Sequence, residues 1–247
     1  MERKTDLENV KRIAKGLLNI PVLETEYSPM IVSHPFTKCG IIILPYDDDY
    51  YQMDITKSQR DFDRWKKLVA ERIDDCQNVD EVYYLLNDSY QLMFFDAIST
   101  YLSTKDYASL LGRVWTGSEY ANEDANVSTD EMIAHFQNVD KKELMSSSEM
   151  KTYNGLDDVI VVYRGVSVEK NNVNALSWTT SFAKAKWFAE RWGDGVVYSA
   201  FANKSDVFAY FDRRNEDEVI VDFNKLQNIK TVKCPQSAPQ REVKVMQ

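Results

Sequence analysis

Apolar residues recur at helical spacing through most of the first 150 positions of the chain. A stripe of five predicts an amphipathic helix within residues 1–20. The stripe consists of Leu7, Val10, Ile13, Leu17 and Leu18. The same periodicity predicts helices at 57–75, 79–102 and 104–115, with a break in the second near Asn87-Asp88.

Two local signals refine this picture. Ser128 and Glu131 have the spacing of a capping box ahead of Met132, which predicts the start of another helix. Residues 40–44 form a short apolar run before Pro45, which predicts one buried strand. We therefore expect residues 1–150 to be mainly helical.

The pattern changes at about residue 157 to short β-rich runs. These runs cover residues 158–163, 175–179, 196–201, 207–211, 219–221 and 229–232. One helix is predicted between them, from Phe182 to Trp192. Helices followed by strands indicate the α+β class.

Composition narrows the kind of protein. The 247 residues are 44% hydrophobic and 28% charged, as in ordinary globular proteins. Three dispersed cysteines and two histidines offer no zinc-site spacing, so we expect no metal. The chain has no signal-like segment and no run of about 18 apolar residues. We expect a cytoplasmic protein with no membrane association.

The charge is unevenly distributed along the chain. Residues 151–247 carry 14 Lys and Arg against 12 Asp and Glu, whereas residues 1–150 carry 16 against 27. On charge alone, an anionic ligand prefers the C-terminal part. A long nucleic acid needs several phosphate contacts, which the net charge of −9 disfavours.

Three polar motifs interrupt the apolar C-terminal strands. Arg164 follows an apolar run and precedes Gly165, and the segment Ser177-Trp178-Thr179-Thr180-Ser181 ends a predicted strand. An isolated arginine at such a place is more often part of a surface salt bridge. Its alternative role is to hold a pyrophosphate, with Gly165 allowing close approach of the backbone. Ser181 is suited to cap the following helix, which leaves Thr179 to face a ligand.

The third motif places two carboxylates before the apolar run 219–221. Glu216 and Glu218 lie two residues apart, so both side chains share one face if the segment is extended. A charged turn entering a strand is the alternative interpretation, and from this motif alone the two are evenly matched.

The order of the motifs resembles the arginine–serine–glutamate class of ADP-ribosyltransferases. This class includes clostridial binary-toxin enzymes, phage-encoded transferases and vertebrate arginine-specific transferases. The resemblance covers about residues 158–232. It implies that Arg164 binds NAD, that Glu218 is the catalytic glutamate and that Glu216 is the upstream glutamate. Thr179 stands where the class has the first serine of Ser-Thr-Ser, which is a departure that keeps the hydroxyl.

The same resemblance implies further roles around the site. NAD would also contact Gly165, Thr180 and Ser181, and more loosely Phe188 and Arg191. The loop from about Tyr210 to Asn215 would recognise the acceptor. The side chains assigned to acceptor recognition are Tyr210, Phe211, Arg213, Arg214 and Glu216.

The implied domain organisation has three parts. Residues 1–54 form an N-terminal extension of a helix and a short strand, and residues 55–235 form the catalytic domain. Within it, a helical lobe (55–150) precedes a β-rich core (155–235) of two packed sheets with an NAD cleft. Residues 236–247 form a flexible tail.

The expected activity is mono-ADP-ribosyl transfer from NAD, as co-substrate, to a macromolecular acceptor. Protein arginine is the first choice for the acceptor, and a nucleic-acid base is the alternative. An NAD glycohydrolase without a macromolecular target is a further alternative, as is a degenerate binding module without activity. A toxin or a role in phage–host conflict fits such an enzyme, and an antitoxin or inhibitor would then be a further partner.

Overall fold

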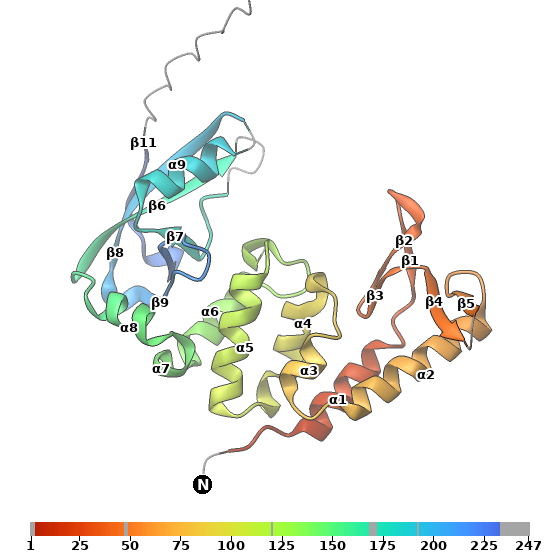
Figure 1. Ribbon diagram of the computed structural model, residues 1–247. Coiled ribbons are helices and arrows are strands. Elements are labelled where there is room, and N and C mark those ends of the chain that lie inside the picture. The colour runs from red at the N-terminus through yellow and green to blue at the C-terminus, as the bar shows by residue number, and fades with distance from the viewer. Residues whose placement is uncertain (1–2, 47–48, 120, 168–171, 192, 233–247) are drawn as a thin grey trace, which may run out of the picture. The chain divides into compact units, whose positions relative to one another are not determined.

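The computed structural model describes residues 3–46, 49–119, 121–167, 172–191 and 193–232 (Figure 1). The chain divides into two compact units, Met1–Ser146 and Ser147–Gln247. Helices and antiparallel sheets are both present, in agreement with the α+β prediction. The boundary lies near the expected change from helices to strands. The grouping of residues 55–235 into one catalytic domain stays a prediction, and the tail 236–247 lies outside the described residues.

The N-terminal unit holds most of the helices. They are α1 (Leu7–Leu17), α2 (Gln59–Asp75), α3 (Val79–Tyr83), α4 (Asp88–Ile98), α5 (Thr104–Gly117), α6 (Thr129–Asn138) and α7 (Lys141–Leu144), with short 3-10 turns at Ser99–Tyr101 and Ala121–Glu123. Trp115, Phe94 and Phe136 are almost completely buried among them. Burial of such apolar side chains is the main force that holds amphipathic helices together.

Side chains at the N-caps explain where several of these helices begin. The Ser128 hydroxyl accepts from the Glu131 backbone N–H, and the Glu131 carboxylate accepts from the Ser128 backbone N–H. This confirms the predicted capping box. The break near Asn87-Asp88 is also confirmed, because Asn87 has an extended backbone (ψ 144°) before α4 begins.

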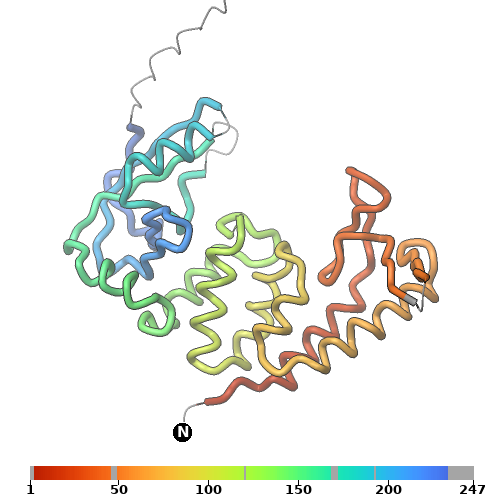
Figure 2. Tube along the Cα trace, in the orientation of Figure 1, coloured from red at the N-terminus to blue at the C-terminus, as the bar shows by residue number. Residues whose placement is uncertain are grey.

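The β structure of the N-terminal unit is more extensive than predicted. It comprises β1 (Leu23–Thr25), β2 (Ser28–His34) and β3 (Thr37–Cys39) in one sheet, and a hairpin of β4 (Ile41–Tyr46) and β5 (Asp49–Asp54), seen in orange in Figure 2. The strand predicted at 40–44 is present as β4, but the expectation that it is buried was wrong, since Ile43 is 61% exposed. The hairpin packs only part of its surface, around Met53 and Trp65.

The C-terminal unit is built on one six-stranded antiparallel sheet. Its elements are α8 (Ser147–Asn154), β6 (Val159–Ser167), β7 (Ser177–Thr179), α9 (Phe182–Glu190), β8 (Gly195–Asn203), β9 (Val207–Phe211), β10 (Glu218–Val221) and β11 (Gln227–Val232), with 3-10 turns at Lys204–Asp206 and Phe223–Lys225. The strand order is β11-β8-β6-β7-β10-β9. All six predicted strands are therefore present.

The expected pair of packed sheets is instead one hydrogen-bonded sheet. Within the part of the chain that the structure describes, its two halves, β11-β8-β6 and β7-β10-β9, are joined by a single register pair, Tyr163 opposite Thr179. Nine register pairs join β6 to β8. The junction beside Thr179 is thus the least paired place in the sheet.

Helix α9 covers the β6–β8 half of the sheet at unusually close range. A Cβ added at Gly165 would lie 1.8 Å from the carbonyl oxygen of Ala185, and one at Gly195 would lie 2.0 Å from that of Ala189. Only glycine permits this approach of backbone to backbone. The helix ends at Glu190, and the predicted end at Trp192 lies outside the described residues.

Among the described helices, none combines the length and the apolar character needed to cross a membrane.

Candidate functional site

The three polar motifs lie on neighbouring strands in the C-terminal unit. Arg164 is on β6, Thr179 ends β7 and Glu218 begins β10. Thr179 is the register partner of both Tyr163 and Glu218. Segments up to 54 residues apart in sequence are thereby brought to one region of the sheet. The sequence shows the three motifs and their order. The pairing of β7 with β6 and with β10 brings them together.

Glu218 is a buried carboxylate at the start of its strand. Glu218 is only 4% exposed, and its Oε1 accepts a hydrogen bond from the Ser177 hydroxyl at 2.5 Å. Ser177 and Thr179 are two apart on β7, so both side chains face the side of the sheet on which Glu218 lies. A charged group in such a place needs hydrogen-bond donors to remain ionised.

The hydroxyl that meets the Glu218 carboxylate is not that of Thr179, the residue in the place of the first serine of the class. The Thr179 hydroxyl donates to the Glu216 carbonyl oxygen at 2.7 Å and accepts from the Ser181 N–H at 3.1 Å. Ser177 takes the orienting position. The alternation of side chains along a strand could have identified it, because Ser177 and Thr179 share a face.

Arg164 connects β6 with the segment that enters β7. Its Nε donates to the carbonyl oxygen of Asn172 at 3.0 Å and its Nη1 to that of Ser177 at 2.7 Å. The guanidinium thus fixes the backbone of the residue whose hydroxyl holds Glu218. These bonds give Arg164 a structural role in addition to the expected contact with a phosphate, which stays a prediction.

The remaining residues expected to bind NAD have identifiable structural partners. The Ser181 hydroxyl caps α9 by accepting from the Lys184 N–H, and the Thr180 N–H donates to the Asp217 carbonyl oxygen at 3.1 Å. Arg191 is exposed, and its guanidinium lies over the ring of Trp187. The ring centroids of Trp187 and Phe188 are 5.0 Å apart. Gly165 lies beneath α9, so its lack of a side chain is explained by helix packing.

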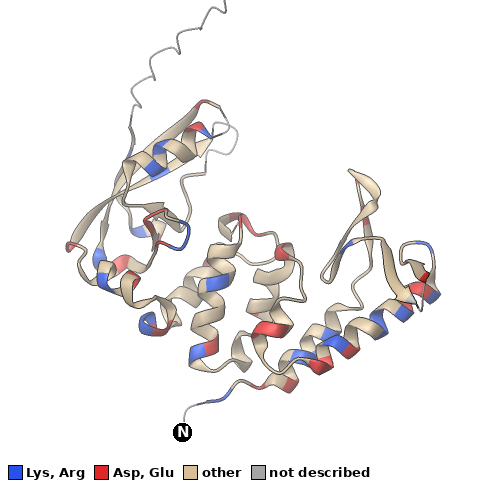
Figure 3. Cartoon of the chain, viewed as in Figure 1, with Lys and Arg blue, Asp and Glu red and all other residues tan. Residues whose placement is uncertain are grey.

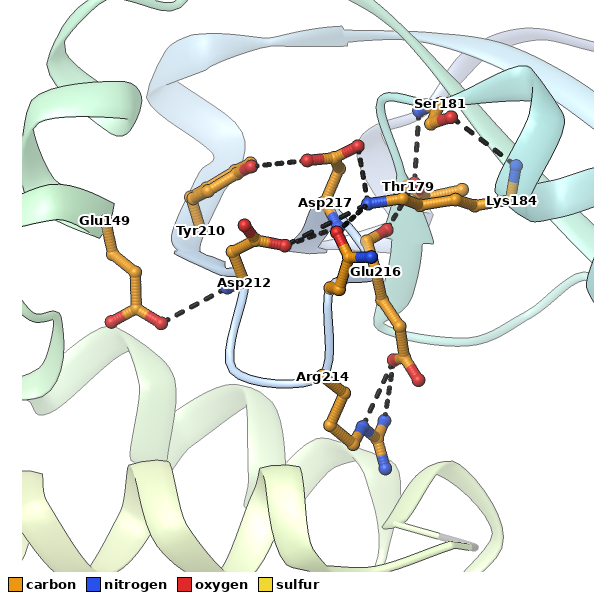
Figure 4. A network of polar contacts seen from close by, with 10 residues as sticks. Glu149, Thr179, Ser181, Lys184, Tyr210, Asp212, Arg214, Glu216 and Asp217 are labelled. Carbon is orange, nitrogen blue, oxygen red and sulfur yellow. Dashed lines mark hydrogen bonds and ion pairs between the residues drawn. The ribbon is translucent and has the colours of Figure 1, made fainter.

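Glu216 and Glu218 do not share the face of one strand. Strand β10 begins at Glu218, and Asp217 has a left-handed backbone with φ +46°. The expected same-face arrangement required an extended segment and is wrong. Glu216 instead points toward Arg214, whose Nη2 lies 2.9 Å from Oε2 (Figure 4).

The loop expected to recognise the acceptor begins and ends two residues later than predicted. Tyr210 and Phe211 belong to β9 and are 5% and 1% exposed, so the loop consists of residues 212–217. The loop contains both basic and acidic residues, coloured blue and red on the cartoon of Figure 3. Arg213 stacks on Phe211, with its Cζ 4.9 Å from the ring centroid, and its Nε lies 3.5 Å from Glu149 Oε1.

A polar network holds this loop to three surrounding elements (Figure 4). Lys184 Nζ of α9 lies 2.8 Å from Asp217 Oδ2, and the Tyr210 hydroxyl of β9 donates to Asp217 Oδ1 at 2.8 Å. Glu149 of α8, itself 5% exposed, accepts from the Asp212 N–H at 3.2 Å. Sequence inspection missed Lys184 and Glu149 because neither belongs to a motif.

The network also shifts the pKa values of two of its members. The hydrogen bond from Lys184 is the main cause that lowers the pKa of Asp217, with Tyr210 contributing. Burial, followed by the bond to Asp217, raises the pKa of Tyr210. Both shifts favour the state in which Asp217 is an anion and Tyr210 a neutral donor.

The described residues contain no group of three His, Cys, Asp or Glu side chains placed to hold a metal ion. The chain matches no protein-family model, no curated protein and no solved structure.

Proposed function

We propose that the protein is an NAD-dependent mono-ADP-ribosyltransferase. The observation that carries the proposal is the buried Glu218 carboxylate, hydrogen-bonded by Ser177 on the strand that Arg164 secures. A fixed carboxylate of this kind suits a reaction in which positive charge develops on a ribose. The resemblance of the motif order to the arginine–serine–glutamate class supports the same conclusion.

In the proposed reaction, the bond between the nicotinamide nitrogen and ribose C1 of NAD breaks. Nicotinamide leaves with the bonding electrons, and Glu218 stabilises the positive charge that develops on the ribose. Ser177 holds the Glu218 carboxylate in one orientation, so little reorganisation is needed during the reaction. Arg164 supplies positive charge for the diphosphate.

Protein arginine remains the first choice for the acceptor. The Glu216 carboxylate holds the guanidinium of Arg214 through Nε at 3.2 Å and Nη2 at 2.9 Å. A carboxylate that pairs with one guanidinium on this loop is chemically suited to pair with an incoming one. Glu216 would accept a proton from the acceptor nitrogen as that nitrogen bonds to ribose C1.

Two glutamate substitutions test this assignment. Glu218→Gln is expected to lower nicotinamide release and transfer together by on the order of 10²–10³-fold or more, because it removes the charge that stabilises the ribose cation. Glu216→Gln is expected to abolish transfer while sparing much of the NAD cleavage. Both are measured with labelled NAD, and Glu190→Gln on the exposed end of α9 is the matched control. Full transfer by Glu218→Gln would contradict the assignment.

The destination of the label identifies the acceptor class. In a lysate incubated with the protein and labelled NAD, label removed by protease indicates protein, whereas label removed by nuclease indicates nucleic acid. Label found only as ADP-ribose indicates a glycohydrolase. A chain that neither binds nor consumes NAD would be the non-catalytic binding module.

A further inference from the structure

Lys184 connects α9 to three side chains of the loop 212–217. Its Nζ lies 2.8 Å from Asp217 Oδ2, 3.2 Å from Asn215 Oδ1 and 3.9 Å from Asp212 Oδ1. The lysine side chain is 25% exposed, less than that of either carboxylate it contacts. One cation thus contacts the beginning, the middle and the end of the loop. Figure 4 shows its contacts with Asp212 and Asp217.

The loop needs such an anchor because of its backbone. Asn215 and Asp217 both adopt left-handed conformations, with φ +56° and +46°. Asparagine and aspartate enter this region more readily than other residues with a side chain, and contacts around them select it over the extended alternatives. Asp217 stands between Glu216 and Glu218, so its conformation decides how the first carboxylate is presented relative to the second.

The position of Lys184 is itself fixed by the sheet. Its neighbour Ala185 lies directly over Gly165, at a distance that excludes any side chain there. The N-terminus of α9 is capped by Ser181, which in turn bonds the Thr179 hydroxyl. The glycine of the arginine motif therefore sets the place from which the lysine reaches the loop.

The two glutamates depend on this anchor to different extents. Glu218 is held by strand pairing with Thr179 and Phe211 and by the Ser177 hydroxyl. Glu216 lies outside the strand, and its carbonyl oxygen accepts a hydrogen bond from the Thr179 hydroxyl at 2.7 Å. Loosening the loop should therefore displace Glu216 more than Glu218.

We propose that Lys184 is the positioning residue of the acceptor loop, required for transfer to a guanidinium acceptor and dispensable for NAD cleavage. The effect of Lys184 on transfer rests on the proposed function. Its role in anchoring the loop depends only on the contacts described above.

The catalytic test compares nicotinamide release with transfer to agmatine, a small guanidinium acceptor. Lys184→Met keeps the aliphatic stem and removes the charge. It is expected to lower transfer at subsaturating agmatine by on the order of 10–100-fold, while nicotinamide release stays within about twofold of wild type, since Glu218 keeps its partners. Lys184→Arg should restore most of the transfer. Lys186→Met, which removes the neighbouring lysine paired with Glu190, is the matched control.

A second measurement follows the loop without any enzymatic activity. Trypsin cleaves after Arg213 and Arg214, whose side chains are 33% and 40% exposed, and the rate reports local opening of the loop. Lys184→Met should accelerate cleavage there, and Lys186→Met should not. The site of cleavage is read by mass spectrometry of the intact fragments.

The outcomes separate the two proposals. Selective loss of transfer with faster tryptic cleavage supports the positioning role. Equal loss of both activities, or unchanged transfer, overturns it. If the wild-type chain releases no nicotinamide, the proposed function fails, and the tryptic rates decide the anchoring: equal rates in the two methionine variants overturn it.

Discussion

At the scale of single residues, Ser177 is the largest change that the structure makes to the candidate site. Its hydroxyl donates to Glu218 Oε1, whereas the Thr179 hydroxyl serves the backbone of Glu216 and Ser181. The motif in the sequence does not show which of these hydroxyls bonds to which partner. That is decided by their positions along β7 and by the residues opposite them in the sheet.

Removing the Ser177 hydroxyl should therefore impair the step that depends on Glu218. We expect Ser177→Ala to lower nicotinamide release by roughly 10–100-fold, because it removes one preorganised donor from a buried carboxylate. Ser177→Thr keeps the hydroxyl and should retain most of the activity. Steady-state nicotinamide release measures both, and equal activity of the alanine and threonine variants would argue against the orienting role.

At the scale of elements, the contact of α9 with the sheet determines the geometry around the loop. The helix was predicted from its periodicity, as were the strands beneath it. Its close approach over Gly165 was not predicted, because it depends on backbone atoms of Ala185 and Ala189 that are far away in sequence. The glycine was assigned to ligand approach, and the structure gives it a packing role.

Gly165→Ala should accordingly destabilise the protein. The new Cβ would lie 1.8 Å from the Ala185 carbonyl oxygen and 2.7 Å from the Ala189 nitrogen, so α9 must move. We expect a loss of about 1–3 kcal/mol or more in the free energy of unfolding, measured by urea denaturation. Gly16→Ala on α1, where a Cβ meets nothing within 4 Å, is the control and should be neutral or stabilising. Equal effects of the two substitutions would contradict the packing role.

At the scale of the whole molecule, stability should depend on pH through His34 in the N-terminal unit. This residue is fully buried, with its ring centroid 4.9 Å from that of Trp65. Burial lowers the pKa of His34 from 6.5 to about 4. The unfolded chain therefore binds a proton at higher pH than the folded chain does.

The sign of this effect follows from the pKa shift. The stabilisation is fully present above pH 6.5, decreases as the pH falls toward 4 and changes no further below that. The total loss is about 3 kcal/mol. Urea denaturation followed by tryptophan fluorescence, in wild type and His34→Gln, should show a difference in stability that shrinks over this range. A difference that is constant from pH 7 to pH 4 would exclude His34 as the cause.

The sequence by itself determined the change from a mainly helical to a strand-rich part of the chain, the capping box at Ser128 and the presence of all six C-terminal strands. These features depend on periodicity and on contacts between near neighbours. It also placed Arg164, Thr179 and Glu218 among the candidates, because polar groups that interrupt apolar strands are costly without a purpose.

Only the tertiary structure decided which of those groups meet. The Ser177 hydroxyl, rather than that of Thr179, donates to the Glu218 carboxylate. The turn at Asp217 separates Glu216 from the strand, and Lys184 reaches the loop from a helix outside every motif. The sequence also did not predict the strands β1, β2, β3 and β5 of the N-terminal unit, because apolar and polar residues show little alternation along them. Such contacts arise from strand register and helix packing between distant segments, and these are set by the fold as a whole rather than by any local pattern.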